Sequence, residues 1–110
     1  MIEQSDIEIV DKEYFEIMES KDYVLVLRSR NTGHFWCLLE QEYNGCRFFQ
    51  IRHRHHAENP YHIQKSRATI ADCCEYIQSH DAYHLKKERR KEERRQRRQA
   101  EKHQKKALPG

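Results

Sequence analysis

The sequence is poor in glycine and proline and has no long apolar run. Only three glycines and two prolines occur in 110 residues, and Gly33, Gly45 and Gly110 lie at predicted turns or at the terminus. This distribution excludes a glycine-rich phosphate-binding loop. No apolar stretch approaches the roughly eighteen residues of a membrane span, and the acidic start lacks the basic and apolar parts of a signal peptide. We therefore expect a cytoplasmic protein without membrane attachment.

Cysteine is also scarce, with four residues in the whole chain: Cys37, Cys46, Cys73 and Cys74. Because a cytoplasmic protein keeps its thiols reduced, we expect buried thiols rather than disulfides. No sequence pattern of a cysteine enzyme surrounds any of them, so we interpret them as small apolar residues. The sequence carries no motif that specifies a reaction, and we predict that the protein is not an enzyme.

Charge is distributed very unevenly along the chain. Residues 1–85 hold nine Lys/Arg and fourteen Asp/Glu, which gives a formal charge of −5, whereas residues 86–110 hold twelve Lys/Arg and four Glu, which gives +8. We therefore divide the chain into a compact acidic body and a basic extension. Such an extension suits a phosphate backbone or an acidic protein surface. It lacks Trp, Phe and regularly spaced Leu, so we do not expect it to lie on a membrane.

Apolar residues recur at helical spacing in the segment that precedes the extension. The positions on one face of a 3.6-residue period are Ile70, Cys73, Cys74, Ile77 and Leu85. Thr69 is a suitable N-cap, with Asp72 three residues later. The pattern predicts one long helix over residues 69–106, ended by Pro109-Gly110. Its first half should close a small core.

The second half of this helix should extend into solvent and bind the partner. Glu93 with Arg97 and Glu101 with Lys105 have the four-residue spacing of helical ion pairs. The alternative is a solvated helical extension that such ion pairs stabilise and that binds nothing. The arm residues that we expect to contact nucleic acid or another partner are Lys86, Lys87, Arg89, Arg90, Arg94, Arg95, Arg97 and Arg98.

The sequence of the rest of the body predicts one short helix and three strands. Residues 2–10 alternate weakly and suggest a short strand or an extended lead-in, and residues 11–20 fit a helix with an apolar face. Aromatic and β-branched residues predict strands over residues 23–29, 34–43 and 46–53. Asn59-Pro60 should interrupt regular structure between the last strand and the long helix. The expected fold is α+β, with a three-stranded antiparallel meander between a short helix and a long one.

The dipeptide Asn44-Gly45 is the strongest local signal, because a two-residue type I′ turn needs positive φ at both positions. Such a turn sets the strand register so that the numbers of paired residues sum to 89. The register pairs Tyr43 with Cys46, Glu42 with Arg47 and Trp36 with His53. Glu42 and Arg47 should form a cross-strand ion pair. Apolar residues on both faces of residues 34–43 mark this strand as the central one.

Eight histidines raise the question of a metal site. The candidate ligands are His53, His55 and His62 around the last strand, and His80 and His84 on the helix. His80 and His84 have the four-residue spacing of zinc-binding helices, and Cys73 lies on roughly the same face. Asp81, however, replaces the Glu of that motif, and the alternative is that these histidines form a polar border. We therefore expect no metal and no cofactor.

Arginines and lysines also accompany aromatic residues in the strands. Those that we expect to contribute to binding are Arg52, Arg54, Lys65 and Arg67. Aromatic side chains on a sheet can stack on bases while arginines contact phosphates. The aromatic residues in question are Trp36, Tyr43, Phe48 and Phe49. Because such residues more often belong to the core, we assign at least three of the four to it.

The expected element order is similar to that of double-stranded RNA-binding domains. Lys65-Ser66-Arg67 stands near the position where that family has a basic cluster before its last helix, although the alanine-rich continuation is missing. A three-stranded sheet covered by a helix also resembles DNA-binding domains of mobile-element integrases. The resemblance is one of topology, and we assign the chain to neither family.

The composition and the charge pattern together favour a small binding module whose basic helix engages nucleic acid or a nucleoprotein complex. Two alternatives remain. One is a protein inhibitor or adaptor of phage or mobile-element type, which blocks a host nuclease complex in the manner of an anti-CRISPR protein. The other is a histidine-rich metal-binding protein. The oligomeric state does not follow from the sequence.

Overall fold

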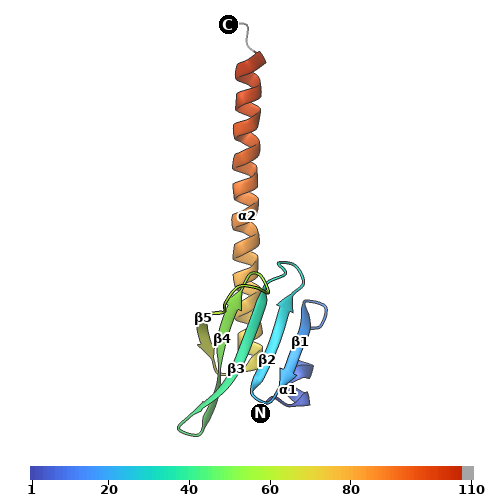
Figure 1. Cartoon of the computed structure of the whole chain (residues 1–110), viewed down its shortest axis with the longest axis vertical. Helices are drawn as coiled ribbons and strands as arrows, with labels where there is room; N and C mark the ends of the chain where they lie inside the picture. The colour runs from blue at the N-terminus through green and yellow to red at the C-terminus, as the bar shows by residue number, and fades with distance from the viewer. Residues whose placement is uncertain (108–110) are drawn as a thin grey trace.

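The computed structural model describes residues 1–107, with side chains described for residues 1–103. The chain forms a five-stranded antiparallel sheet in the order β1-β2-β3-β4-β5 with two helices (Figure 1). The elements are α1 (Gln4–Ile9), β1 (Phe15–Lys21), β2 (Val24–Ser29), β3 (Phe35–Tyr43), β4 (Cys46–Arg54), β5 (His62–Arg67) and α2 (Ile70–Ala107). The predicted α+β class with a short N-terminal helix and a long C-terminal one is confirmed. The sheet, however, has five strands instead of three.

The three predicted strands and their register are confirmed. Asn44 and Gly45 have φ values of 50° and 76°, as a type I′ turn requires. Strand β3 pairs with β4 from Tyr43 opposite Cys46 to Phe35 opposite Arg54, and the pair of Trp36 and His53 lies between them. The five-strand order places β3 in the middle of the sheet, as its apolar composition predicts.

The first twenty residues differ from the sequence prediction, because a helix and a strand exchange places. Residues 2–10 contain α1, and residues 11–20 lead into β1. Phe15 is fully buried and Ile17 packs against the core, so every second side chain points inward, as in a strand. A bulge after Ile17 leaves Met18 exposed, and Asp22 adopts positive φ in the tight connection to β2. The pairing with β2 therefore decides the conformation.

Strand β5 is the second difference, since the sequence predicted only a connecting segment there. It pairs with β4 at the edge of the sheet, just after Asn59-Pro60. Its side chains are exposed or half-buried, so the apolar alternation that marks a strand is missing. With β1 and β5 present, the element order no longer matches that of double-stranded RNA-binding domains.

The core lies between one face of the sheet and the first half of α2 (Figure 1). The buried sheet residues include Leu25, Leu27, Trp36, Leu38, Phe49 and Ile51, and the buried helix residues are Ile70, Cys73, Cys74 and Ile77. Thr69 caps the helix as predicted, because its hydroxyl accepts a hydrogen bond from the Asp72 N–H at 3.1 Å. Leu85 was wrongly assigned to this stripe: its side chain is 41% exposed. The helix has left the sheet at that point.

Several other expectations about burial are also corrected. All four cysteines are free thiols, but Cys46 is exposed and Cys37 is only half-buried. Of the four aromatic residues assigned mainly to the core, Trp36 and Phe49 are buried. Tyr43 is 72% exposed at the hairpin tip, and Phe48 is half-buried on the opposite face of the sheet.

A buried carboxylate fixes α2 against the body. Asp81 is fully buried and accepts hydrogen bonds from the Tyr14 hydroxyl at 2.7 Å and from the Thr32 hydroxyl at 3.2 Å. Burial and the hydrogen bond to Asp81 raise the pKa of Tyr14 well above its usual value, so the phenol keeps its proton. The helix is thereby joined to the segment before β1 and to the β2–β3 loop.

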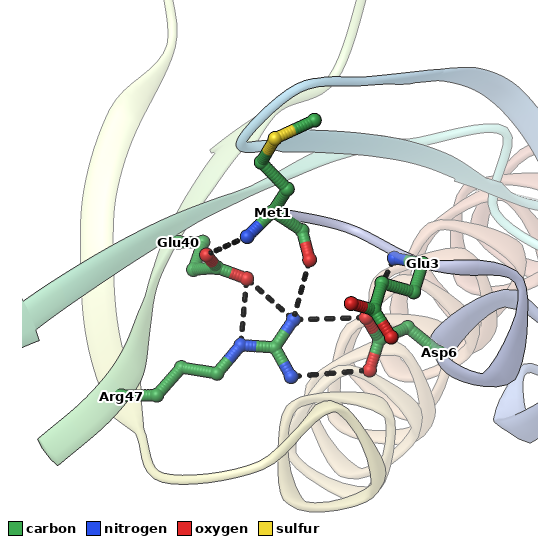
Figure 2. Close-up of polar contacts among 5 residues, drawn as sticks. All are labelled: Met1, Glu3, Asp6, Glu40 and Arg47. Atoms are coloured by element: carbon green, nitrogen blue, oxygen red, sulfur yellow. Dashed lines mark hydrogen bonds and ion pairs between the residues drawn. The ribbon is translucent and has the colours of Figure 1, made fainter.

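A second polar cluster holds α1 against the sheet. Figure 2 shows the Arg47 guanidinium between the carboxylates of Asp6 and Glu40, with the N-terminal ammonium of Met1 on the other side of Glu40. Two nitrogens of Arg47 donate to Asp6 at 2.8 and 3.2 Å. The register pairs Arg47 with Glu42 as expected, but the ion pairs go to Asp6 and Glu40 instead. These two carboxylates are buried, whereas Glu42 is exposed.

Candidate functional site

The second half of α2 projects beyond the body and forms the basic arm, defined as residues 86–107. Figure 1 shows this part of the helix extending away from the sheet, and the molecule measures 74 × 27 × 24 Å. The arm is about 33 Å long at about 1.5 Å per residue. Every side chain from Leu85 to His103 is exposed. The arm therefore offers its charge to a partner without any change in the body. The predicted end of the helix at Pro109-Gly110 lies outside the described residues.

The cations of the arm are concentrated on one side of the helix. At about 100° per residue, a single arc of about 120° contains six of the cations between residues 86 and 98. We call this arc the cationic face, and its members are Lys86, Lys87, Arg90, Arg94, Arg97 and Arg98. The opposite side carries Glu88, Glu92, Gln96 and Gln99, whereas Glu101 lies within the arc, one turn beyond Arg98. Arg89 and Arg95, which the sequence also nominated, lie outside the arc.

An exposed aromatic side chain stands at the root of the cationic face. Tyr83 is 68% exposed and lies within the same arc, one turn before Lys86 and Lys87. A shallow hollow on this side of α2 is lined by Tyr83, Lys86, Lys87, Arg90, Lys91 and Arg94. The sequence analysis did not single out Tyr83. Its position four residues before Lys87, within the arc of the cations, is the signal that identifies it.

Few ion pairs neutralise the arm. Lys91 lies 3.6 Å from Glu88, and Arg95 lies 3.2 Å from Glu92. Among the side chains described, no member of the cationic face has a carboxylate within 4.0 Å, and the expected pair of Glu93 and Arg97 does not form. The expected pair of Glu101 and Lys105 includes a side chain outside the described set. The positive charge of the cationic face is thus available.

The other four nominated cations lie on the body. Arg52 and Arg54 alternate with buried residues of β4, so they lie on the sheet face away from α2. The Arg54 guanidinium covers the Tyr61 ring at 4.3 Å. Lys65 and Arg67 belong to edge strand β5, and Arg67 lies over Tyr76 on the second turn of α2. The structure does not bring these residues onto the cationic face.

Five histidines meet where α2 leaves the sheet. The Nε2 atom of His53 lies 3.0 Å from Nδ1 of His34, and the His53 ring stacks on Trp36 with 4.0 Å between centroids. The His34 ring stacks on His55, and its centroid is 4.5 Å from that of His84. The fifth member is His80, which packs edge-on against His53 and Trp36.

The ligand nitrogens of His34, His55 and His84 all lie within 4.8 Å of one another. The sequence analysis nominated His55 and His84 but missed His34. The hairpin register contained the signal, because 34 and 55 sum to 89 and the two residues continue the pairing of β3 with β4 beyond Phe35 and Arg54.

Of the other nominated ligands, His53 and His80 lie in the cluster beside this trio, whereas His62 and Cys73 lie outside the cluster. His62 is exposed on β5, opposite His53. Cys73 is fully buried in the apolar core, and burial raises the pKa of its thiol to about 12. The thiolate that a metal needs is therefore disfavoured there.

Burial keeps four histidines of the cluster neutral, namely His34, His53, His55 and His80. It lowers the pKa of His34 to about 4 and that of His53 to about 3, and the charged forms of the neighbouring histidines act in the same direction. Burial also lowers the pKa of His55 and of His80. At neutral pH these four rings are uncharged. Each therefore has one nitrogen lone pair that can accept a hydrogen bond or bind a cation.

Comparison with protein-family models, with curated proteins and with solved structures finds no match for this chain. Within the described part of the chain, no helix has the length and apolar composition needed to cross a membrane.

Proposed function

We propose that the protein is a cytoplasmic, non-enzymatic binding module that engages nucleic acid, or a nucleoprotein complex, through the cationic face of its basic arm. The observation that carries this proposal is the segregation of charge on α2. Between residues 86 and 98, six cations without carboxylate partners share one side of an exposed helix, and Glu88 and Glu92 lie on the other side. Glu101 is on the cationic side, one turn beyond Arg98. A merely solvated helix gains more from mixing the two charges around its circumference, because neighbouring opposite charges stabilise it.

The charge spacing of the arm suits a phosphate backbone. From Lys86 to Arg98 the helix rises about 18 Å, which gives about one cation per 3 Å. Each strand of duplex DNA carries about one phosphate per 3.4 Å of axis. Tyr83 adds an aromatic ring at the root of the same face, where it can stack on an exposed base or pack against a sugar.

Binding of short labelled duplex DNA and duplex RNA, measured by fluorescence anisotropy at moderate ionic strength, tests this proposal. The variant with Arg90, Arg94 and Arg97 all replaced by Ala removes three cations from the face and keeps the helix, because Ala has the best helix propensity. Each phosphate contact contributes about 0.9 to the slope of log affinity against log salt concentration, which is about 0.9 of a decade between 1 M and 0.1 M salt. We therefore expect the loss of three contacts to lower the affinity at 0.1 M salt by about 500-fold.

The matched control replaces Arg89, Arg95 and Lys102, three cations outside the cationic face, by Ala. The control changes the net charge by the same amount. Equal losses of affinity in the two variants would therefore show that overall charge, and not the cationic face, determines binding. If the parent protein binds neither duplex nor single-stranded nucleic acid, the proposal is wrong. An acidic protein surface then becomes the partner, as for an inhibitor or adaptor of a nuclease complex.

A further inference from the structure

We propose that His34, His55 and His84 form a site for one divalent late transition metal ion, with zinc as the best-suited ion. The three residues come from separate elements: His34 directly precedes β3, His55 directly follows β4, and His84 lies on α2. Their ligand nitrogens lie within 4.8 Å of one another. In a tetrahedral zinc site with Zn–N bonds of about 2.0–2.1 Å, ligand nitrogens lie about 3.3 Å apart. The ligand nitrogens therefore need to approach one another by at most about 1.5 Å.

The side chain of His55 can make this adjustment. His55 is exposed at the end of its strand, whereas His34 is buried. The His34 and His55 rings are stacked at 4.0 Å with an angle of 11° between their planes. Rotation of the His55 ring about its side-chain bonds turns its lone pair toward the ion. The terminal torsion of histidine is broad and two-fold, so this rotation costs little.

A second histidine orients the buried ligand. The Nε2 atom of His53 lies 3.0 Å from Nδ1 of His34. When Nδ1–H of His34 donates to Nε2 of His53, the Nε2 lone pair of His34 is left to bind the ion. Metal-binding histidines commonly have their other ring nitrogen held in this way, which fixes both tautomer and ring orientation. His53 is itself fixed by stacking on the buried Trp36. The arrangement thus has an ordered outer partner as well as three ligands.

The chemistry of the ligand set selects the class of ion. Three imidazoles suit zinc, copper and nickel, whereas calcium and magnesium prefer oxygen ligands. One side of the trio opens into a hollow lined by Arg28, Thr32, Phe35 and Glu58, among others. A fourth coordination position can therefore be taken by water or by an anion from solvent. Binding would join the β2–β3 loop, the end of β4 and the root of the basic arm through a single ion.

Calorimetric titration of zinc chloride into the untagged full-length protein tests the site. We expect one equivalent of zinc to bind and the midpoint of thermal unfolding to rise with zinc concentration, because an ion that binds only the folded state stabilises it. The H55Q variant should lose more than about a hundredfold in zinc affinity, since even the loss of an outer partner costs about 10–100-fold. The His55 side chain is exposed, so this substitution leaves the fold intact.

The matched control is H103Q, which removes an exposed histidine near the far end of the basic arm. It should bind zinc as the parent does. A second ligand variant, H84Q, should abolish the zinc-dependent rise in the unfolding midpoint. The inference is overturned if the parent takes up no zinc, if H55Q binds zinc like the parent, or if H103Q loses as much affinity as H55Q.

Discussion

At the scale of single residues, the buried carboxylate of Asp81 shows how a polar group can replace an apolar one in a core. It occupies the helix face that Ile70 and Ile77 begin, and it accepts hydrogen bonds from Tyr14 and Thr32. Leu85, the next apolar residue with helical spacing, lies beyond the sheet. Sequence periodicity could not predict the burial of Asp81, because an Asp is expected to be exposed to solvent unless its hydrogen-bond donors are known.

We predict that Asp81→Ala lowers the free energy of unfolding by about 2–4 kcal/mol, because hydrogen bonds to a charged group are worth about 1.5–3 kcal/mol and the Tyr14 hydroxyl loses its acceptor. Glu75→Ala, at an exposed position on the same helix, should change it by less than about 0.5 kcal/mol. Urea denaturation measures both. Equal effects of the two substitutions would show that the Asp81 hydrogen bonds contribute nothing specific.

The Arg47 cluster leads to a prediction about pH. Hydrogen bonds from Arg47 hold the pKa of Asp6 below its usual value. Burial alone would raise the pKa of Glu40, but the N-terminal ammonium and Arg47 lower it overall. A carboxylate with a lowered pKa in the folded state contributes stability above its unfolded pKa and loses that contribution as the pH falls through the folded value. The stability should therefore decline as the pH is lowered below the ordinary carboxyl range, 3.8 for Asp and 4.5 for Glu.

Arg47→Gln should reduce this decline, because it removes the cation that both carboxylates share. Its cost at neutral pH should be only about 1 kcal/mol, since the Arg47 side chain is 42% exposed and solvent screens the ion pairs. Chemical denaturation of both proteins across acidic pH provides the measurement. A parallel pH dependence in parent and variant would mean that other groups govern the acid response.

At the scale of elements, the sequence predicts correctly those parts of the fold whose residues have a strong local conformational preference. Asn44-Gly45 determines the hairpin and, through it, the pairing of Trp36 with His53. The edges of the sheet lack such a signal. Strand β1 carries a bulge that breaks its alternation, and β5 has mostly polar side chains. Both are strands because a neighbouring strand pairs with them, which is information that local sequence does not contain.

The hairpin turn itself can be tested at Gly45, which has a φ of 76° and open space where a Cβ would stand. Gly45→Val should lower the free energy of unfolding by about 1–2 kcal/mol, because a side chain in the left-handed region is strained even without a clash. The same substitution at the exposed Ser66 on β5, where φ needs no glycine, should cost less. Thermal unfolding of the two variants gives the comparison, and equal losses would contradict the assigned role of the turn.

The candidate sites were recovered to different degrees, for physical reasons. The basic arm follows from composition alone, because no tertiary contact repositions an exposed helix. The histidine cluster needed the fold, because His34, His55 and His84 come from three elements. The register aligned the first two, but only the packing of α2 across the sheet adds the third.

At the scale of the whole molecule, the acidic body and the basic arm combine to a net charge of only +3. The arm nevertheless carries its positive charge along about 33 Å of a single helix that projects away from the body. Six cations on one face can neutralise several phosphates at once. A binding free energy of this origin depends on the release of condensed counterions and therefore on salt.

The most direct test of the proposed function is the dependence of duplex DNA affinity on salt concentration. About four to six phosphate contacts should give a slope of about −4 to −5 in a plot of log association constant against log salt concentration. Replacing Arg90, Arg94, Arg97 and Arg98 by Ala should bring the slope close to −1, because about four contacts are lost. A parent slope near zero, or a slope unchanged by these substitutions, would contradict binding through the cationic face.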